Sequence, residues 1–183
     1  MSTKTTWQID TAHSAAEFAV KHLMISTVKG YFADVQGTVT ADDANPAAST
    51  VEVTIGVASI DTRDDKRDAH LKSGDFFDAE QYPTIRFTGK RINGSVDGEF
   101  TLVGDLTIRD VTREVTLAVE SAGRARDPWG GERAGFAATT RINRKDFGLT
   151  WNVALEAGGV LVGDDVKISI DLQLVKQAAQ AAA

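Results

Sequence analysis

The chain has 183 residues, of which 42% are hydrophobic and 25% are charged. This length and composition are typical of one soluble domain, and no run approaches the roughly 18 apolar residues that a transmembrane helix needs. Acidic residues outnumber basic ones by 26 to 20, and the net charge of −6 argues against nucleic acid as a partner. The absence of cysteine excludes disulfides and thiolate chemistry.

The two ends of the chain set the expected domain limits. The first ten residues, MSTKTTWQID, lack the apolar segment and the cleavage site of a secretory signal, so we expect a cytoplasmic protein. Residues 1–176 are expected to form a single barrel domain. Residues 177–183 contain only Ala and Gln and are expected to form a flexible tail.

Alternation of apolar and polar residues predicts strands along most of the chain. In residues 14–22, for example, Ala16, Phe18, Val20 and His22 share one face. Glycines inside the second strand indicate the bends that a curved sheet requires. In chain order, the predicted strands are 14–22, 28–41, 51–58, 85–94, 100–108, 114–120, 133–143 and 166–175.

Residues 59–87 interrupt this pattern. They contain a charged, helix-like segment, the aromatic pair Phe76-Phe77 and the turn Tyr82-Pro83. Because the interruption adds aromatic side chains to a curved sheet, we expect it to cover an opening. The charged half of the interruption is interpreted as a solvated helix face with i,i+4 ion pairs.

Long strands and regular pairing of sequence neighbours favour a closed antiparallel barrel over a two-sheet sandwich. The predicted fold class is therefore all-β: an eight-stranded antiparallel barrel with a short helical insertion. Eight strands enclose an interior that is either filled with side chains or wide enough for one slender ligand. Large Phe and Trp side chains mix with Ala, Gly and Thr on the inferred inner faces. The sequence therefore does not decide between a filled interior and one that holds a ligand.

Histidine occurs only at positions 13, 22 and 70, which limits the possible catalytic and metal-binding sites. His13 and Ser14 are adjacent in the sequence and point to opposite faces, so they cannot act as base and nucleophile for each other. No metal-binding motif surrounds His70, and the sequence has no glycine-rich nucleotide motif. We therefore expect no catalytic residue, no metal and no cofactor.

His22 continues an inward-facing series of apolar residues. A buried imidazole needs a hydrogen-bond partner. The partner is either a backbone carbonyl or carboxylate of the core, or a polar group of a ligand, and the sequence leaves both open. Tyr82, Trp129 and Trp151 pose a similar choice between core packing and a pocket mouth, and packing is their expected role.

Short motifs follow one another along the chain: Trp7-Gln8-Ile9-Asp10 with His13-Ser14, Phe18-Ala19-Val20-Lys21-His22, Gly30-Tyr31-Phe32, Ser59-Ile60-Asp61-Thr62, Arg67-Asp68-Ala69-His70-Leu71, Asp75-Phe76-Phe77-Asp78, Tyr82-Pro83, Gly104-Asp105-Leu106-Thr107-Ile108 and Arg144-Lys145-Asp146-Phe147-Gly148. Together they closely resemble the YceI-like family over residues 6–175. The chain departs from the family in one hairpin, where Asp110 and Glu114 replace the Gly and Pro often found there.

The resemblance implies a lipocalin-like barrel whose elongated apolar tunnel binds a polyisoprenoid, an isoprenoid quinone or a fatty-acyl amphiphile without catalysis. It also implies a homodimer. Polar groups near the mouth, His22 among them, are expected to orient the head group without strong charge selection. The expected ligand-binding residues are Phe18, Val20, His22, Phe32, Phe76, Phe77, Phe87, Phe136, Phe147 and Trp151.

Two other functions remain open. One is an enzyme or a stress-response accessory protein that acts on a lipid-like or quinone substrate. The other is a protein-interaction module with a filled core. A filled core would leave no cavity large enough for a ligand, whereas an enzyme would need converging polar groups inside the barrel.

Overall fold

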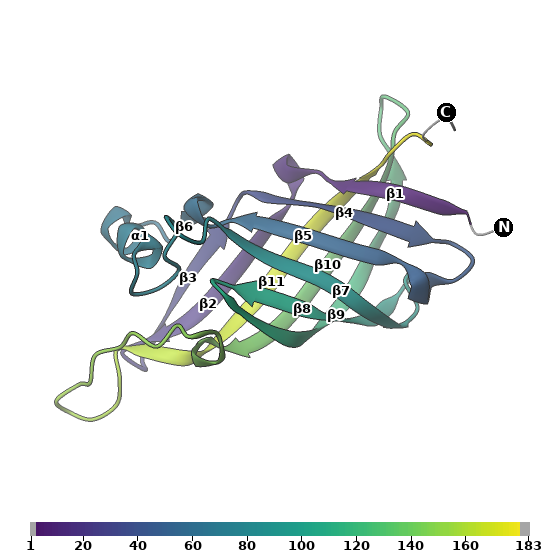
Figure 1. Ribbon diagram of the computed structural model, residues 1–183. Helices are drawn as coiled ribbons and strands as arrows, with labels where there is room; N and C mark the ends of the chain where they lie inside the picture. Colours follow the sequence, from purple (N-terminus) through teal and green to yellow (C-terminus); the bar gives the residue numbers. More distant parts are fainter. Residues whose placement is uncertain (1–2, 180–183) are drawn as a thin grey trace.

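Eleven strands form one continuous antiparallel sheet that closes into a barrel because β1 pairs with β11 (Figure 1). The computed structural model describes residues 3–179. In chain order the elements are β1 (Lys4–Ile9), η1 (Thr11–His13), β2 (Ala15–His22), β3 (Ser26–Phe32), β4 (Val35–Asp42), η2 (Pro46–Ala48), β5 (Thr50–Gly56), η3 (Val57–Ser59), β6 (Ile60–Asp61), α1 (Asp65–Lys72), β7 (Thr84–Gly94), β8 (Glu99–Ile108), β9 (Val111–Arg126), β10 (Glu132–Asn143), η4 (Arg144–Phe147) and β11 (Val162–Lys176). The η elements are short 3-10 helices.

Three pairs of consecutive strands, β1 with β2, β3 with β4 and β5 with β6, each form one long, bent barrel strand. β1 and β2 both pair with β11, while β4 and β3 pair with β1 and β2 respectively. β6 continues β5 by pairing with β3. Eleven strands less these three continuations give eight barrel strands, and the predicted eight-stranded antiparallel barrel is confirmed.

The structure corrects several predicted strand boundaries. Residues 28–41, predicted as one strand, form β3 and β4, which are separated by a bend at residues 33–34. The alternation does not predict β1, whose buried positions Trp7 and Ile9 are too few to show a pattern. The strand predicted over 114–120 continues to Arg126 in β9, where most residues are exposed and no apolar alternation marks the strand.

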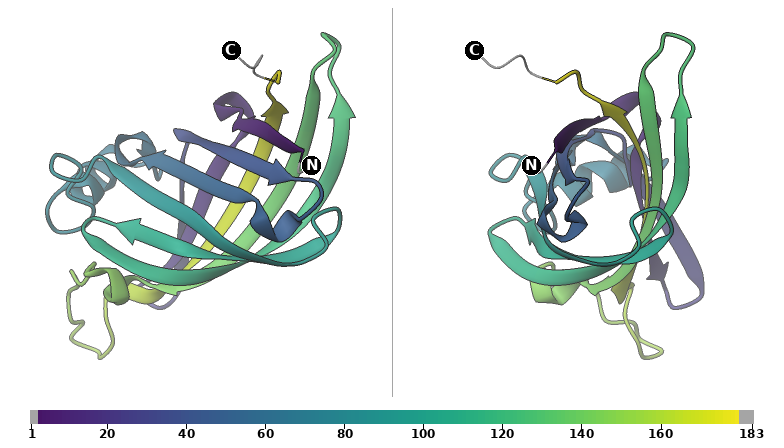
Figure 2. Two further views of the ribbon diagram at one scale, coloured as in Figure 1. Left: turned by 45° about the vertical axis from the view of Figure 1, so that its right-hand side comes forward. Right: turned by 90° about the vertical axis from the view of Figure 1, so that its right-hand side faces the viewer.

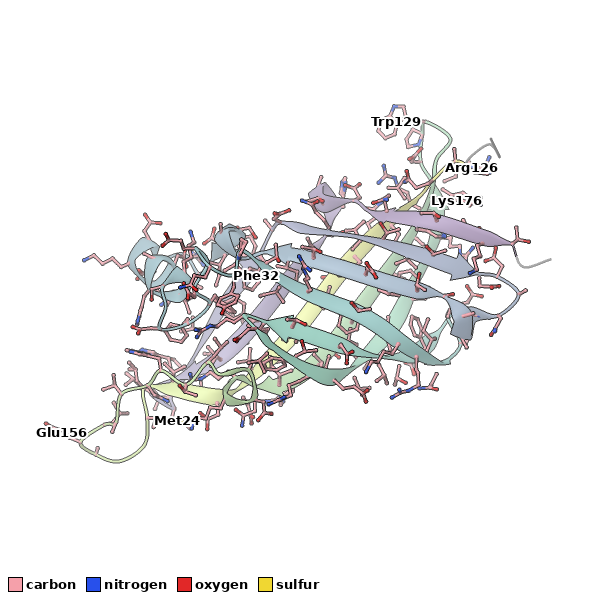
Figure 3. All side chains as sticks on the ribbon, in the orientation of Figure 1. Met24, Phe32, Arg126, Trp129, Glu156 and Lys176 are labelled. Atoms are coloured by element: carbon pink, nitrogen blue, oxygen red, sulfur yellow. The ribbon has the colours of Figure 1, made fainter. Side chains whose placement is uncertain are left out.

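β9 and β10 extend beyond the barrel as a two-stranded hairpin (Figure 2). The hairpin tip carries Trp129, whose side chain points away from the barrel (Figure 3). Trp129 is 86% exposed, so the prediction that it packs in the interior is wrong.

At the C-terminus, residues 177–179 follow β11 without regular secondary structure. The rest of the predicted tail, residues 180–183, lies outside the described residues. No helix in the described part of the chain is long and apolar enough to cross a membrane.

The interruption at residues 59–87 contains α1 and lies at one end of the barrel (Figures 1 and 2). Asp64 caps the helix, because its Oδ1 accepts a hydrogen bond from Arg67 N at 3.0 Å. Asp68 Oδ1 accepts from Thr62 N at 2.9 Å, and Arg67 Nη2 donates to the Thr62 carbonyl at 2.6 Å. These bonds fix α1 to the end of β6, and the predicted helical insertion is confirmed.

An ion-pair cluster joins the N-terminal segment to the β9–β10 hairpin. Arg133 donates from Nη1 to Asp10 Oδ2 at 2.6 Å and from Nε to Asp127 Oδ2 at 3.0 Å. His13 Nδ1 lies 2.9 Å from Asp10 Oδ2. The hydrogen bond from Arg133, followed by that from His13, lowers the pKa of Asp10 below its usual value of 3.8.

We expect Asp10→Asn to lower the free energy of unfolding by about 1 kcal/mol at neutral pH, as for a partly exposed ion pair. Because the folded-state pKa of Asp10 is lowered, its charge stabilises the fold above its ordinary pKa, and this contribution disappears as the pH falls through the folded-state pKa. Urea unfolding at neutral pH and at about pH 3 measures the change. Asp165→Asn, at an exposed carboxylate, is the control. If Asp10→Asn lowers the free energy of unfolding by the same amount at about pH 3 as at neutral pH, this role of Asp10 is contradicted.

Candidate ligand-binding cavity

The barrel is hollow and encloses a cavity of about 560 Å³. Small-molecule sites in proteins have volumes of about 300–1,000 Å³. Inward-facing residues of the barrel strands line the cavity, for example Leu102 and Leu106 of β8 and Leu117 and Val119 of β9. A filled core, which the sequence leaves open, is therefore not the arrangement that the structure shows.

Nine of the ten residues predicted to bind a ligand line this cavity. The exception is Phe147, which is 2% exposed and packs in the hydrophobic core without reaching the cavity lining. The nine residues that line it are Phe18, Val20, His22, Phe32, Phe76, Phe77, Phe87, Phe136 and Trp151. The contact of these side chains with a ligand stays a prediction.

Two glycines make room for predicted aromatic residues inside the barrel. Phe18 of β2 pairs with Gly30 of β3, and a Cβ atom at Gly30 would collide with the Phe18 ring. A Cβ atom at Gly104 of β8 would collide in the same way with the ring of Phe87 on β7. The strand glycines therefore allow these rings to lie against the backbone of a neighbouring strand, which leaves the centre of the barrel open.

A row of phenylalanine rings connects the insertion to the barrel strands. The ring centroids of Phe18 and Phe32 lie 5.7 Å apart, and those of Phe32 and Phe77 also lie 5.7 Å apart. These separations are typical of favourable aromatic pairs. Figure 3 shows Phe32 at the end of β3, close to the insertion. Phe77 therefore extends the aromatic lining of β2 and β3 into the insertion.

His70, Phe76 and Trp151 form what we call the α1-end cluster. The His70 ring centroid lies 4.6 Å from that of Trp151 and 5.1 Å from that of Phe76, both in edge-to-face geometry. The Phe76 and Trp151 centroids are 5.4 Å apart. His70 Nε2 lies 2.8 Å from Asp75 Oδ2, and all three rings line the cavity. The charged half of the interruption is predicted to be a solvated helix face. For His70 this prediction is wrong, because its ring lines the cavity.

Arg109 holds the insertion from the β8–β9 turn. Its Nη1 donates to the Phe76 carbonyl at 3.4 Å, and its guanidinium carbon lies 5.7 Å from the centroid of the Tyr82 ring. Arg109 adopts a left-handed backbone conformation with φ of 55°, which is uncommon for a non-glycine residue. The insertion is thus fastened to a second turn as well as to β6.

Arg144 is the functional residue that the sequence least revealed. Only 3% of it is exposed. Its Nη1 donates to the carbonyls of Leu149 at 2.7 Å and Trp151 at 2.9 Å, and its Nε donates to the Gly163 carbonyl at 2.9 Å. Burial lowers the pKa of the Arg144 guanidinium. Arg144 therefore holds the segment between η4 and β11, and with it Trp151, against the barrel.

His22 is partly buried and lines the cavity. Within residues 3–179, no hydrogen bond joins its ring to another protein group. The carbonyl or carboxylate partner expected of a core histidine is therefore not found in the described part of the chain. This leaves the His22 ring available to a polar group of a ligand.

A closed antiparallel barrel of eight strands around an apolar cavity defines the lipocalin-like class of folds. Within this class, comparison with known families identifies the YceI-like domain over residues 7–174. The chain belongs to the YceI-like family, as the sequence motifs predict.

Individual proteins show the same relationship. A UPF0312 protein of Staphylococcus aureus is 42% identical over 164 residues, which cover 89% of this chain and 93% of that protein. The crystal structure of Burkholderia cenocepacia BcnA matches with a TM-score of 0.75 and 26% identity, over 90% of this chain and 98% of that one. A polyisoprenoid binding domain from Saccharophagus degradans matches with a TM-score of 0.65 over 92% and 97% of the two chains, and at 13% identity it shows a shared fold.

Proposed function

We propose that this protein binds one long-chain apolar ligand in the barrel cavity, and carries or stores it without chemical conversion. The ligand class is a polyisoprenoid, an isoprenoid quinone or a fatty-acyl amphiphile. The observation that carries the proposal is the hollow, mainly apolar interior of the closed barrel. The Saccharophagus degradans domain, described as polyisoprenoid binding, has the same fold and supports the proposal.

The distribution of the lining residues favours a long ligand over a compact one. The lining extends from His70 and Trp151 at the α1 end to Asp42 and Pro46 at the opposite end of the barrel. Transfer of a hydrocarbon chain from water into such a cavity is favourable by about 0.8 kcal/mol per buried CH₂ group. Affinity should therefore rise with chain length until the cavity is full.

Native mass spectrometry of the purified protein tests this function. We expect a species heavier than the polypeptide. Organic extraction should release a long-chain lipid, after which the protein has only the mass of the polypeptide. Protein stripped of lipid should recover the heavier species when a polyprenol is added. Protein that is empty as purified, and that takes up neither polyprenols nor fatty acids, would refute the proposal.

The same experiment separates binding from catalysis. If the protein only binds, a ligand recovered after long incubation has an unchanged mass, whereas conversion to a new species would support the enzyme alternative. The homodimer and the cytoplasmic location stay predictions from the sequence. Native mass spectra at several protein concentrations and fractionation of the source cells check them.

A further inference from the structure

The charged residues that line the cavity gather toward its two ends, and the two sets have opposite signs. Toward the α1 end the lining includes Arg67 and Arg144 together with His22 and His70, and toward the β4–β5 connection it includes the buried Asp42. Exposed charged residues also border the cavity: Glu17 and Lys21 at the first end, and Asp43, Asp97 and Arg124 at the second. The ends of the cavity therefore present different electrostatic environments to a polar group.

Two side chains at the α1 end keep donor capacity for a ligand. Arg67 uses Nε and Nη2 to donate to the hydroxyl and the carbonyl of Thr62, at 2.8 and 2.6 Å. A guanidinium has five N–H groups, so donors remain after these two bonds. His22 has no ring hydrogen bond within residues 3–179. Arg144, in contrast, is occupied by backbone carbonyls, and its Nη2 lies 3.9 Å from Asp164 Oδ1, so a carboxylate already accompanies its charge.

The opposite end is unfavourable for an anion. Asp42 is buried and its Oδ1 accepts hydrogen bonds from Ala44 N at 3.1 Å and Asn45 N at 3.0 Å. Arg124, the cation of this end, lies 3.7 Å from Asp97 Oδ1, so a carboxylate already accompanies it. An anionic group placed here would be repelled by these carboxylates, and by the buried Asp42 most strongly.

We propose that the ligand carries an anionic head group, phosphate-like or carboxylate-like, that His22 and Arg67 bind at the α1 end. This inference rests on the proposed function and adds the head-group chemistry and the direction of the ligand. The apolar tail then runs from the α1-end cluster toward the opposite end of the barrel, where the β4–β5 connection and the β7–β8 turn lie. Charge-assisted hydrogen bonds of this kind are stronger than those to a neutral hydroxyl.

Matched lipids that share one chain and differ in the head group test the proposal. We expect a polyprenyl phosphate to bind about tenfold more tightly than the polyprenol, and a fatty acid more tightly than the fatty alcohol. The corresponding alkyl amine should bind most weakly. The phosphate and carboxylate pairs together identify which anion is preferred. Equal affinities within each pair would overturn the head-group inference and leave the proposed function intact, whereas no binding of any lipid would refute the proposed function itself.

Substitution at the two ends gives a second test. His22→Leu should remove most of the preference for the anionic lipid while the affinity for the alcohol stays the same. Arg67→Gln should act in the same direction, with circular dichroism as a check because Arg67 also contacts Thr62. Asp97→Asn, which changes the charge at the opposite end, is the matched control and should leave the preference unchanged. A preference that persists in both His22→Leu and Arg67→Gln would overturn the assignment.

Tryptophan fluorescence reports the direction of the ligand. Trp151 lines the cavity at the α1 end, and Trp7 of β1 lines it in the other half of the barrel. Variants that retain one of these two tryptophans, both with Trp129→Phe, are loaded with a fatty acid brominated at the end of its tail. Because bromine quenches by contact, we expect quenching of Trp7 and little quenching of Trp151. Quenching confined to Trp151 would overturn the proposed direction.

Discussion

Ala138→Trp is expected to reduce lipid affinity about fiftyfold while the barrel stays folded. Ala138 of β10 is 8% exposed and lines the cavity, so the larger side chain would occupy space that the ligand needs. If the indole excludes about three CH₂ groups of the tail, the loss is about 2.4 kcal/mol, or roughly fiftyfold in the dissociation constant. Displacement of a fluorescent fatty acid measures the affinity, and the thermal midpoint reports the fold.

The neighbouring residue provides a matched control for this prediction. Ala137 is exposed, and adjacent strand residues point to opposite faces of the barrel. Ala137→Trp makes the same substitution on the outside and should leave lipid affinity unchanged. If both variants bind as the wild type does, the ligand site does not lie inside the barrel.

Arg144→Met should lower the free energy of unfolding by about 3–5 kcal/mol, the largest stability effect that we expect from a single side chain here. Methionine fills a similar space but has no donors, so the carbonyls of Leu149, Trp151 and Gly163 would lose their partner. Urea unfolding measures the loss, and hydrogen exchange should show reduced protection in residues 149–163.

The adjacent lysine separates burial from charge. Lys145 Nζ lies 3.3 Å from Asp164 Oδ2, and its side chain is 49% exposed. Lys145→Met removes the same charge from an exposed ion pair and should cost at most about 1 kcal/mol. Arg144→Lys keeps the positive charge but not the planar set of donors, and should fall between the two. A destabilisation by Arg144→Met no larger than that by Lys145→Met would show that the carbonyl contacts contribute little.

The barrel could be predicted because most inward-facing strand residues are apolar and most outward-facing ones are polar. This alternation is strong in β5, β8 and β11, where the apolar–polar pair repeats several times in succession. It fails in β1, which is short, and in the outer part of β9, which leaves the barrel and buries few side chains. Pairing, rather than sequence pattern, determines the structure of those two segments.

The cavity lining could be predicted residue by residue where the residue lies on a strand, as for Phe18 and Phe87. Outside the strands the prediction holds for Phe76, Phe77 and Trp151, which line the cavity, but it fails for Phe147 and misses His70. Phe147 follows Arg144 in a 3-10 helix that packs its ring into the core, outside the cavity lining. His70 shares a helix with exposed charged residues, and only the contact with Trp151, which is distant in the sequence, reveals its position.

The pairing of β1 with β11 also has a consequence for the time at which the protein becomes functional. Trp7 pairs with Lys176, so the seam of the barrel joins the first strand to the last. Contacts this far apart in sequence form late in folding and are slow, because a long loop must close first. During synthesis the ring therefore stays open until β11 has left the ribosome and can pair with β1. Until then the nascent barrel has no enclosed interior.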